Sequence, residues 1–416
     1  MTFQIPQRRS VLGSRLSTHR LCFATPALIG GALRDKPPSL GLVPLLAGLR
    51  FWWRAGVHRG APASMRREEI RLFGGPAEDE RPAKNERPAD KGDADSRSRS
   101  ADKGNIAEKA SPTGGIGAFQ PELDPLCFGP WTKDAKAESV VRANSALSDF
   151  LGSAMGGTSA KVFAFLEAGA SGTLTLRERP RATTQADPTG QPEAPIEALD
   201  LALNLMTTFG GLGLLGRRGL GSINDAARTD LDINAFTTHV EKLIATVRER
   251  RRPSPPLSGT AAATPPPDPW RSLPTFATFS HATRCVVLDM THTRTGLDAL
   301  AELATAVGNF AKSPPVAFAP EHVFSAQSAI TGKATRGRWP SQLHIHVQQL
   351  AAGYAIVLTH LPTAFPPLAK DGRAAHDAEI AKAEFDAATL RIETFLDQIP
   401  HAGLAGAVHP ITVPRE

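Results

Sequence analysis

The first half of the chain shows hydrophobic patterns with two different periods. Residues 16–23 alternate in part between apolar and polar side chains and residues 173–177 alternate strictly, which predicts two strands that each bury one face. Apolar residues recur every three or four positions after Pro44 and Pro195, which predicts helices beginning at these prolines. Short strands between these elements and a last strand beginning at Ser222 complete the order βαββαβ. This order is the ferredoxin-like arrangement, which is also the frame of RNA-recognition modules.

The second half repeats this plan in weaker form. Its predicted elements are a strand at 285–288, a helix at 297–310, a hairpin of 343–347 and 354–358 with a turn at Gly353, and a helix at 380–399. No residue-by-residue repeat accompanies the repeated order of elements. The predicted fold class is therefore α+β, with two ferredoxin-like (RRM-like) domains.

Two changes in composition divide the chain. Residues 76–111 carry almost no large apolar side chain and mix charged residues with Pro, Gly and Ser, which predicts a disordered insertion. Residues 251–269 are rich in proline, which favours an extended linker. We therefore predict an N-terminal domain at 1–250, this linker, and a C-terminal domain at 270–416. A length of 416 residues and an apolar fraction of 41% are sufficient for two hydrophobic cores.

Composition and charge narrow the class of protein. Cys22, Cys127 and Cys285 lie far apart without CxxC spacing, so neither a disulfide framework nor a zinc site is predicted. Apolar runs are all shorter than the ~20 residues that span a bilayer, and we expect a cytoplasmic protein that needs no cofactor, no metal and no membrane. The net charge of +6 and the isoelectric point near 9.4 suit a polyanionic partner.

A glycine-rich run at 210–222 carries the strongest chemical signal. It contains six glycines and two adjacent arginines, Arg217 and Arg218. The run matches GxGxxG literally, but it follows a predicted helix, whereas a dinucleotide fingerprint follows a strand and opens a helix. Backbone N–H groups of glycines can approach phosphate oxygens, and the two arginines can add charge-assisted contacts. The alternative is a tight helix-to-strand turn that packs on the sheet.

The segment Leu49-Arg50-Phe51-Trp52-Trp53-Arg54 has two interpretations as well. Helical geometry places Arg50 and Arg54 on one face and the tryptophans on another. We expect Trp52 and Trp53 to lie in the core, because stacking on bases would require exposed rings. The two arginines could clamp phosphate or pair with the glutamates at 68 and 69. Arg336 and Arg338, ahead of the predicted strand at 343–347, form a further basic patch beside a tryptophan.

Support for catalysis is thinner. His19, His58 and His281 are candidate general acids or bases, but a histidine without a second catalytic residue at a readable spacing is usually structural. His344 and His346 lie on one face of a strand and could share a metal, although no Cys, Asp or Glu beside them completes a ligand set. We therefore predict no catalytic residue.

These motifs in combination resemble the RAMP superfamily of CRISPR-associated proteins. Thr25-Pro26 with Gly30-Gly31, the segment 49–54, Leu72-Phe73-Gly74-Gly75 and the glycine run together look like subunit one of the type III-B Cmr effector complex. The match covers about 16–223 and extends more loosely to the predicted hairpin and C-terminal helix. The segment 336–343 departs from the pattern usual at that place in the family, Arg-Arg-Ala-Ser-Pro-Leu.

The resemblance implies an RNA-binding, non-catalytic subunit that holds the 3′ portion of guide RNA, or target RNA, for antiviral defence. The implied partners are guide CRISPR RNA, complementary target RNA and other Cmr or RAMP subunits. Two alternatives stay open: a metal-independent RAMP endoribonuclease that processes guide RNA through a histidine, and an adaptor that binds only proteins. The residues predicted to contact RNA are Gly210, Gly211, Gly213, Gly216, Arg217, Arg218, Gly219, Gly221, Arg50, Arg54, Arg336 and Arg338.

Overall fold

The structure is a computed structural model of the chain. It describes residues 15–28, 42–58, 62–74, 119–123, 129–132, 146–147, 150–151, 165–179, 195–213, 216–251, 277–312, 325–326, 339–340, 342–364, 386 and 389–411. The predicted insertion at 76–111, the predicted linker beyond Arg251, and both Arg336 and Arg338 lie outside the described residues. The predicted domain boundaries stay predictions.

The first sheet has the strand order expected of a ferredoxin-like unit. Its strands are β1 (Leu16–Phe23), β2 (Ala27–Leu28), β3 (Phe119–Leu123), β4 (Gly129–Thr132), β5 (Phe165–Glu178) and β6 (Ile223–Asp225). β1 lies between β6 and β5, and β2, β3 and β4 pair with β5. Each of these pairings is antiparallel. The four strands of the βαββαβ unit are β1, β2, β5 and β6, in chain order. The fourth of them, β6, lies beside the first, β1, and the second, β2, lies beside the third, β5. This is the order that βαββαβ connections produce.

The helices of the first half are α1 (Leu42–Trp52), a π-helical turn at Trp53–Val57, α2 (Pro62–Phe73), α5 (Pro195–Phe209), a 3₁₀ turn at Ala226–Arg228, and α6 (Ile233–Arg251). α5 begins at its predicted proline, whereas α1 begins two residues before Pro44. α2 ends at Phe73 and is followed by Gly74, whose φ of 75° is the left-handed conformation usual just after a helix and whose N–H donates to the Ile70 carbonyl. Local sequence therefore sets the start of α5 and the end of α2, whereas the start of α1 differs from its prediction by two residues.

The second sheet repeats the same topology. Its strands are β7 (Arg284–Met290), β10 (Leu343–Leu350), β11 (Gly353–His360) and β12 (Val408–Ile411), in the antiparallel order β10-β11-β7-β12. α7 (Gly296–Lys312) follows β7, and residues 389–398 are helical. A two-stranded sheet is formed by β8 (Ser325–Ala326) and β9 (Trp339–Pro340). The strand order of the two larger sheets confirms the predicted α+β fold class with ferredoxin-like units.

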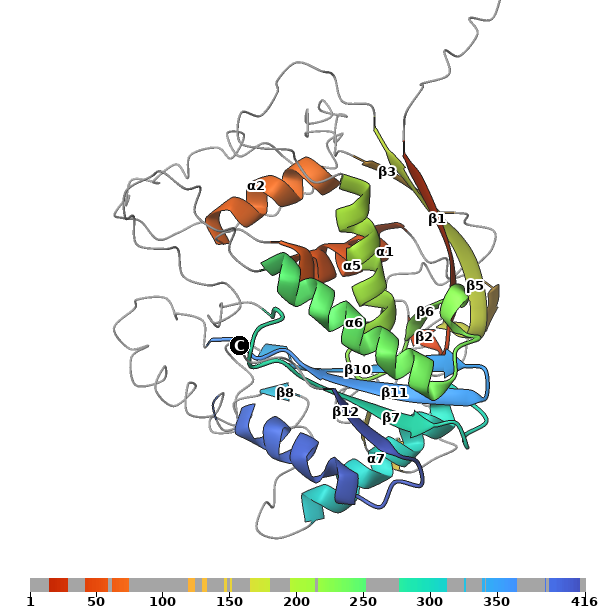
Figure 1. The fold of residues 1–416 in the computed structure, drawn as a ribbon. Helices are drawn as coiled ribbons and strands as arrows, with labels where there is room; N and C mark the ends of the chain where they lie inside the picture. The colour runs from red at the N-terminus through yellow and green to blue at the C-terminus, as the bar shows by residue number, and fades with distance from the viewer. Residues whose placement is uncertain are drawn as a thin grey trace, which may run out of the picture.

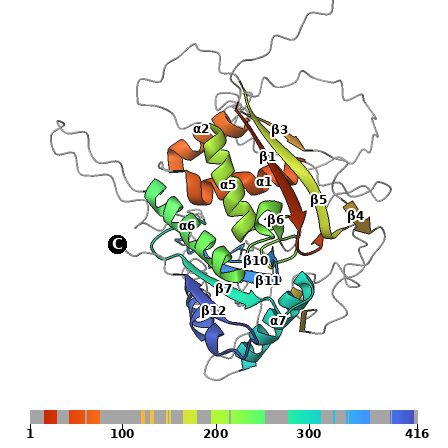
Figure 2. The same cartoon turned by 45° about the vertical axis from the view of Figure 1, so that its right-hand side comes forward.

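The two sheets do not have separate cores. One cluster of buried side chains joins α1, α5 and α6 to one face of the second sheet, which includes Val287 and Val357. The other cluster joins α7 to the opposite face, which includes Val286 and Leu288. Figure 1 shows the second sheet between α6 on one side and α7 on the other, and Figure 2 shows the same layering. The second sheet is therefore buried on both faces, and the halves of the chain pack as one body.

Among the described residues, no helix combines the length and the hydrophobicity needed to cross a membrane.

Candidate functional site

Three motifs that are far apart in the sequence meet around the glycine run. Thr25 accepts the N–H of Ser222 at 3.0 Å and donates to the Gly219 carbonyl at 2.7 Å, while the Pro26 carbonyl accepts the N–H of Gly221 at 2.8 Å. On the other side, a Cβ on Gly210 would overlap the indole nitrogen of Trp52. The Thr25-Pro26 pair, the α1 segment and the glycine run therefore form one packed unit.

The glycines of the run are needed for backbone conformation and for close packing. Gly213, Gly219 and Gly221 have φ angles of 87°, 88° and 65°, which L-residues with a side chain rarely adopt. A Cβ on Gly221 would overlap the Leu212 carbonyl oxygen, and one on Gly213 would overlap the Leu28 carbonyl oxygen. These positions match the alternative interpretation from the sequence, a tight turn packed on the sheet.

The run also completes the edge of the second sheet. β10 is an edge strand, and its N–H groups at alternate positions donate across to the first half of the chain. Ile345 donates to the Arg217 carbonyl at 2.9 Å, Val347 donates to the Ser222 hydroxyl at 2.9 Å, and Gln349 donates to the Asn224 side chain at 2.7 Å. Because an unpaired strand edge exposes its polar backbone, these contacts act as a substitute for a neighbouring strand.

His346 fixes this junction from within the core. Its Nδ1 lies 2.5 Å from the Gly210 carbonyl oxygen, and its Nε2 lies 3.2 Å from the Asn224 amide nitrogen. Burial lowers the pKa of His346 to about 4, so the ring is neutral at pH 7, donates from Nδ1 and accepts at Nε2. Both ring nitrogens have partners, so His346 does not supply the metal ligand that the sequence left open.

Arg217 and Arg218 are neighbours in the run, but they differ in burial and in the groups that they contact. Arg218 is buried, and its Nη1 donates to the Phe150 carbonyl at 3.0 Å. Arg217 is half-buried, and its guanidinium lies 5.2 Å from the centre of the Phe51 ring, within cation–π range. Burial lowers the pKa of Arg217, but the group stays charged at neutral pH. Arg217 is thus the arginine of the run that lies closer to solvent.

Arg50 and Arg54 face α2 in their hydrogen bonds and ion pairs. Arg54 forms a two-pronged pair with Glu69, with distances of 3.0 and 2.8 Å. Arg50 donates to the Gly74 carbonyl at 3.1 Å and lies 3.8 Å from Glu69. Each keeps more than a third of its side chain exposed, 35% for Arg50 and 38% for Arg54, so both can still reach a ligand. Trp52 and Trp53 are each 2% exposed, as expected for core residues.

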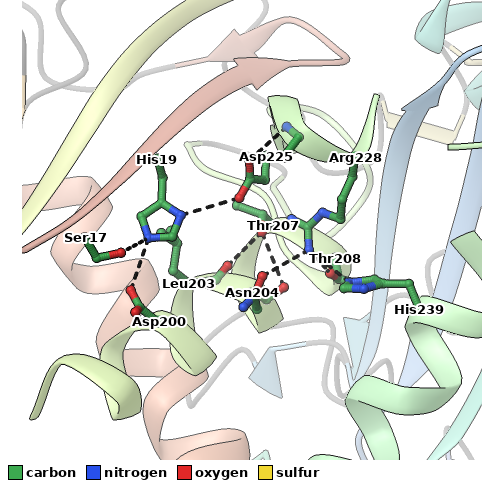
Figure 3. Close-up of polar contacts among 11 residues, drawn as sticks. Ser17, His19, Asp200, Leu203, Asn204, Thr207, Thr208, Asp225, Arg228 and His239 are labelled. Atoms are coloured by element: carbon green, nitrogen blue, oxygen red, sulfur yellow. Dashed lines mark hydrogen bonds and ion pairs between the residues drawn. The ribbon is translucent and has the colours of Figure 1, made fainter. Parts of the chain in front are cut away.

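His19 lies between Asp200 and Asp225, and the sequence analysis did not predict this contact. Its Nε2 lies 3.1 Å from Asp200 and 2.6 Å from the Ser17 hydroxyl, and its Nδ1 lies 3.5 Å from Asp225 (Figure 3). Burial lowers the pKa of His19, but the hydrogen bonds and charges of the two carboxylates outweigh burial and raise it to about 9. The ring is therefore an imidazolium at neutral pH that ties β1 to α5 and β6.

Arg228 occupies the neighbouring part of Figure 3 and is a buried cation. Its guanidinium donates hydrogen bonds to the hydroxyls of Thr207 and Thr208 near the C-terminal end of α5. It also donates to the ring of His239 on α6. Burial lowers the pKa of Arg228 to about 10, and burial together with this guanidinium lowers the pKa of His239 to about 4. A cation at the C-terminal end of a helix is favourable, so Arg228 supports the end of α5 from which the glycine run departs.

Sequence reasoning missed the residues that act through long-range contacts. Asp200 and Asp225 reach His19 from 181 and 206 positions away, and Asn224 reaches β10 from 125 positions away. The sequence signal for this cluster was the alternation of polar and apolar residues along β1, which puts Ser17 and His19 on the same face of the strand. Cys22 is half-buried and Cys285 is buried, and both are free thiols; Cys127 lies outside the described residues.

The comparisons with known proteins identify the fold. No protein-family model matches the chain, and no curated protein matches its sequence. In structure, the chain has the same overall fold as a solved Cmr1 protein. The solved structure that carries this likeness is the apo crystal structure of Cmr1 from Pyrococcus furiosus, with a TM-score of 0.50 and 13% identity, covering 95% of this chain and 98% of that chain.

Two other solved structures are similar. A chain of the type III-B Cmr-beta complex bound to cognate target RNA and AMPPnP in the presence of ssDNA gives a TM-score of 0.46 at 10% identity, covering 90% of this chain and 99% of that chain. A chain of the same complex bound to cognate target RNA gives a TM-score of 0.45 at 9% identity, with the same coverage.

Proposed function

We propose that this protein is an RNA-binding subunit of a type III-B Cmr effector complex, and that it acts in the cytoplasm. It holds guide or target RNA beside other RAMP subunits and does not cut it. The observation that carries the proposal is a fold like that of Cmr1 over 95% of the chain, in which three of the motifs named above, Thr25-Pro26, the α1 segment and the glycine run, form one packed unit. The excess of positive charge, +6, agrees with a polyanionic partner.

The chemistry of the site supports contact through side chains. In the glycine run, the N–H groups of Leu212, Gly216 and Gly221 donate to backbone carbonyls, so they serve packing. Arg50 and Arg54 keep more than a third of their side chains exposed on the same unit, and Arg217 beside them is partly exposed. In RNA-guided complexes base pairing supplies sequence specificity, and proteins hold the backbone, which is what arginines do well.

Among the histidines that the structure describes, His19 has a hydroxyl and two carboxylates around its ring, an arrangement that a nuclease could use. Ser17, Asp200 and Asp225 lie within 3.5 Å of its ring nitrogens. A general base must be neutral and must reach substrate, yet with a pKa of about 9 His19 stays protonated, and both nitrogens are held by carboxylates. The geometry therefore favours a structural ion cluster, and RNA cleavage stays the alternative that the experiment must test.

The test is a pair of measurements on the purified chain with labelled single-stranded RNA. Binding is measured across a salt series, and a cleavage gel is run from the same tubes. Arg217→Ala is the variant, because Arg218 is buried and its removal would disturb the fold. Arg15→Ala is the matched control, since Arg15 is 59% exposed and pairs with Glu197 on another part of the surface.

We expect intact RNA and affinity that falls with salt. Loss of one phosphate contact should weaken binding about fivefold at ~0.1 M salt and reduce the slope of log K against log salt by ~0.7, whereas the control should match the wild type. Cleavage that disappears in His19→Gln would establish the nuclease instead. No binding by the wild-type chain would contradict the proposal for the isolated protein and favour the adaptor.

A further inference from the structure

The basic and the acidic side chains of helix α2 lie on different faces of the helix. Arg66, Arg67 and Arg71 are exposed, while Glu68 and Glu69 are partly buried and Leu72 is buried. At 3.6 residues per turn the three arginines span roughly 140° of the helix circumference, and Arg66 and Arg71 are separated by ~7.5 Å along its axis. The solvent-facing side of α2 is therefore a basic stripe.

The two acids of α2 are used inside the protein. Glu69 accepts both hydrogen bonds from Arg54, at 3.0 and 2.8 Å, and Glu68 lies 3.1 Å from the buried His58 ring. The hydrogen bond from His58 holds the pKa of Glu68 below its ordinary value, although burial opposes this, so the carboxylate stays ionised. Both acids thus have partners on the side of α2 that faces the protein, and neither lies between the arginines on the outer face.

Counting charge over the same residues shows the imbalance. Described residues 42–58 and 62–74 contain five arginines and two glutamates, which leaves +3 without counting His58. That is half of the net +6 of the whole chain, concentrated in two adjacent helices. A concentration of this kind produces a local positive potential that attracts polyanions.

The stripe has the composition of a phosphate-binding surface. Among the described residues, the exposed large hydrophobic side chains are Leu16, Val43 and Leu390, and none of them belongs to α2. Protein interfaces need an apolar or aromatic core, whereas contacts to a nucleic-acid backbone need mainly Arg and Lys. We propose that Arg66, Arg67 and Arg71 form a second contact surface for the sugar-phosphate backbone of single-stranded RNA. This inference rests on the proposed RNA-binding function.

The experiment compares Arg66→Gln/Arg71→Gln with Arg15→Gln/Arg177→Gln in the full chain. The control removes the same charge from exposed arginines that pair with Glu197 and Glu122. If two phosphates are lost, the slope of log K against log salt for single-stranded RNA should fall by ~1.4 and affinity by about 25-fold at ~0.1 M salt. Melting temperatures should be unchanged, because the α2 arginines are exposed. The control pair should bind as the wild type does.

The outcomes separate this inference from the proposed function. If the wild type binds RNA and Arg217→Ala weakens binding, but the α2 variant binds with the wild-type slope, the stripe is not an RNA surface and the proposed function stands. If the wild type does not bind RNA, both proposals fail. A parallel titration with polyglutamate tests an acidic protein partner: preference for polyglutamate over RNA, lost in the α2 variant, would overturn the assignment to RNA.

Discussion

The ion cluster around His19 makes a quantitative prediction about stability and pH. The carboxylates of Asp200 and Asp225 raise the pKa of His19 from 6.5 to about 9 against the effect of burial. One pKa unit corresponds to ~1.36 kcal/mol, so the shift is equivalent to about 3 kcal/mol of folding free energy. Because the folded-state pKa is the higher one, this contribution is complete below pH 6.5 and is lost as the pH rises through about 9.

The perturbation is His19→Gln, which keeps a polar side chain of similar size and removes the titrating charge. At about pH 6 we expect the free energy of unfolding to fall by roughly 3 kcal/mol, and by about pH 9.5 we expect this difference to disappear nearly completely. The measurement is urea unfolding of both proteins at the two pH values. Cys22 occurs in both proteins and His19 does not contribute to its raised pKa, so its titration cancels in the comparison.

The control is His292→Gln. His292 lies 2.6 Å from Glu302, but its side chain is 40% exposed, so removing it should cost at most ~1 kcal/mol. A difference between His19→Gln and wild type that stays constant from acid to alkaline pH would refute the reasoning, because it would show that His19 acts through packing and not through charge. A difference that grows with pH would show that the sign of the shift is wrong.

Two further substitutions test the junction between the sheets. Gly221→Ala should lower stability by at least ~2 kcal/mol, since the new Cβ would overlap a backbone carbonyl and φ is 65°, whereas Gly403→Ala, with φ of 73° and open space around it, should cost only ~1 kcal/mol in the same thermal melts. Asn224→Ala should cost about 2–4 kcal/mol, because it leaves the Gln349 N–H and the Val347 carbonyl without their partner, and exchange of the Gln349 amide should accelerate. Asn224→Asp is the control, because it keeps an acceptor for the Gln349 N–H and should leave exchange of that amide slow. Slow exchange of the Gln349 amide in Asn224→Ala would contradict this account.

Much of the fold could be predicted because its determinants are local. The alternation at 173–177 lies within β5, and the apolar spacing after Pro195 gives a helix whose Leu199 and Met206 are fully buried. The hairpin at Gly353 follows from two short apolar runs and one glycine, whose φ is 142°. The order of these elements then restricts the topology to few possibilities, of which the ferredoxin-like one is found.

The site could be predicted only in part, because spacing does not specify what a side chain meets. Arg217 and Arg218 are equivalent in sequence, yet Arg218, which forms a parallel bridge with Ile345, is the buried one. His19 looked solitary because its two carboxylates follow in the distant segments α5 and β6. Such contacts depend on tertiary packing, and no local pattern encodes them.

The packing of the glycine run also limits how this protein can bind RNA. Gly211 pairs with Ser222, the N–H of Leu212 donates to Gly221, and the Gly210 carbonyl accepts from His346. The first two contacts close the run on itself, and the third ties it to β10 of the second sheet, so replacing a glycine should disturb the fold before it disturbs recognition. Sensitivity to salt and to arginine substitution should therefore report on the arginine side chains, while the backbone of the run keeps those side chains in position. If binding depends on Arg217 and on the α2 stripe, the glycines contribute by holding α1, and with it the basic surface of α2, in place.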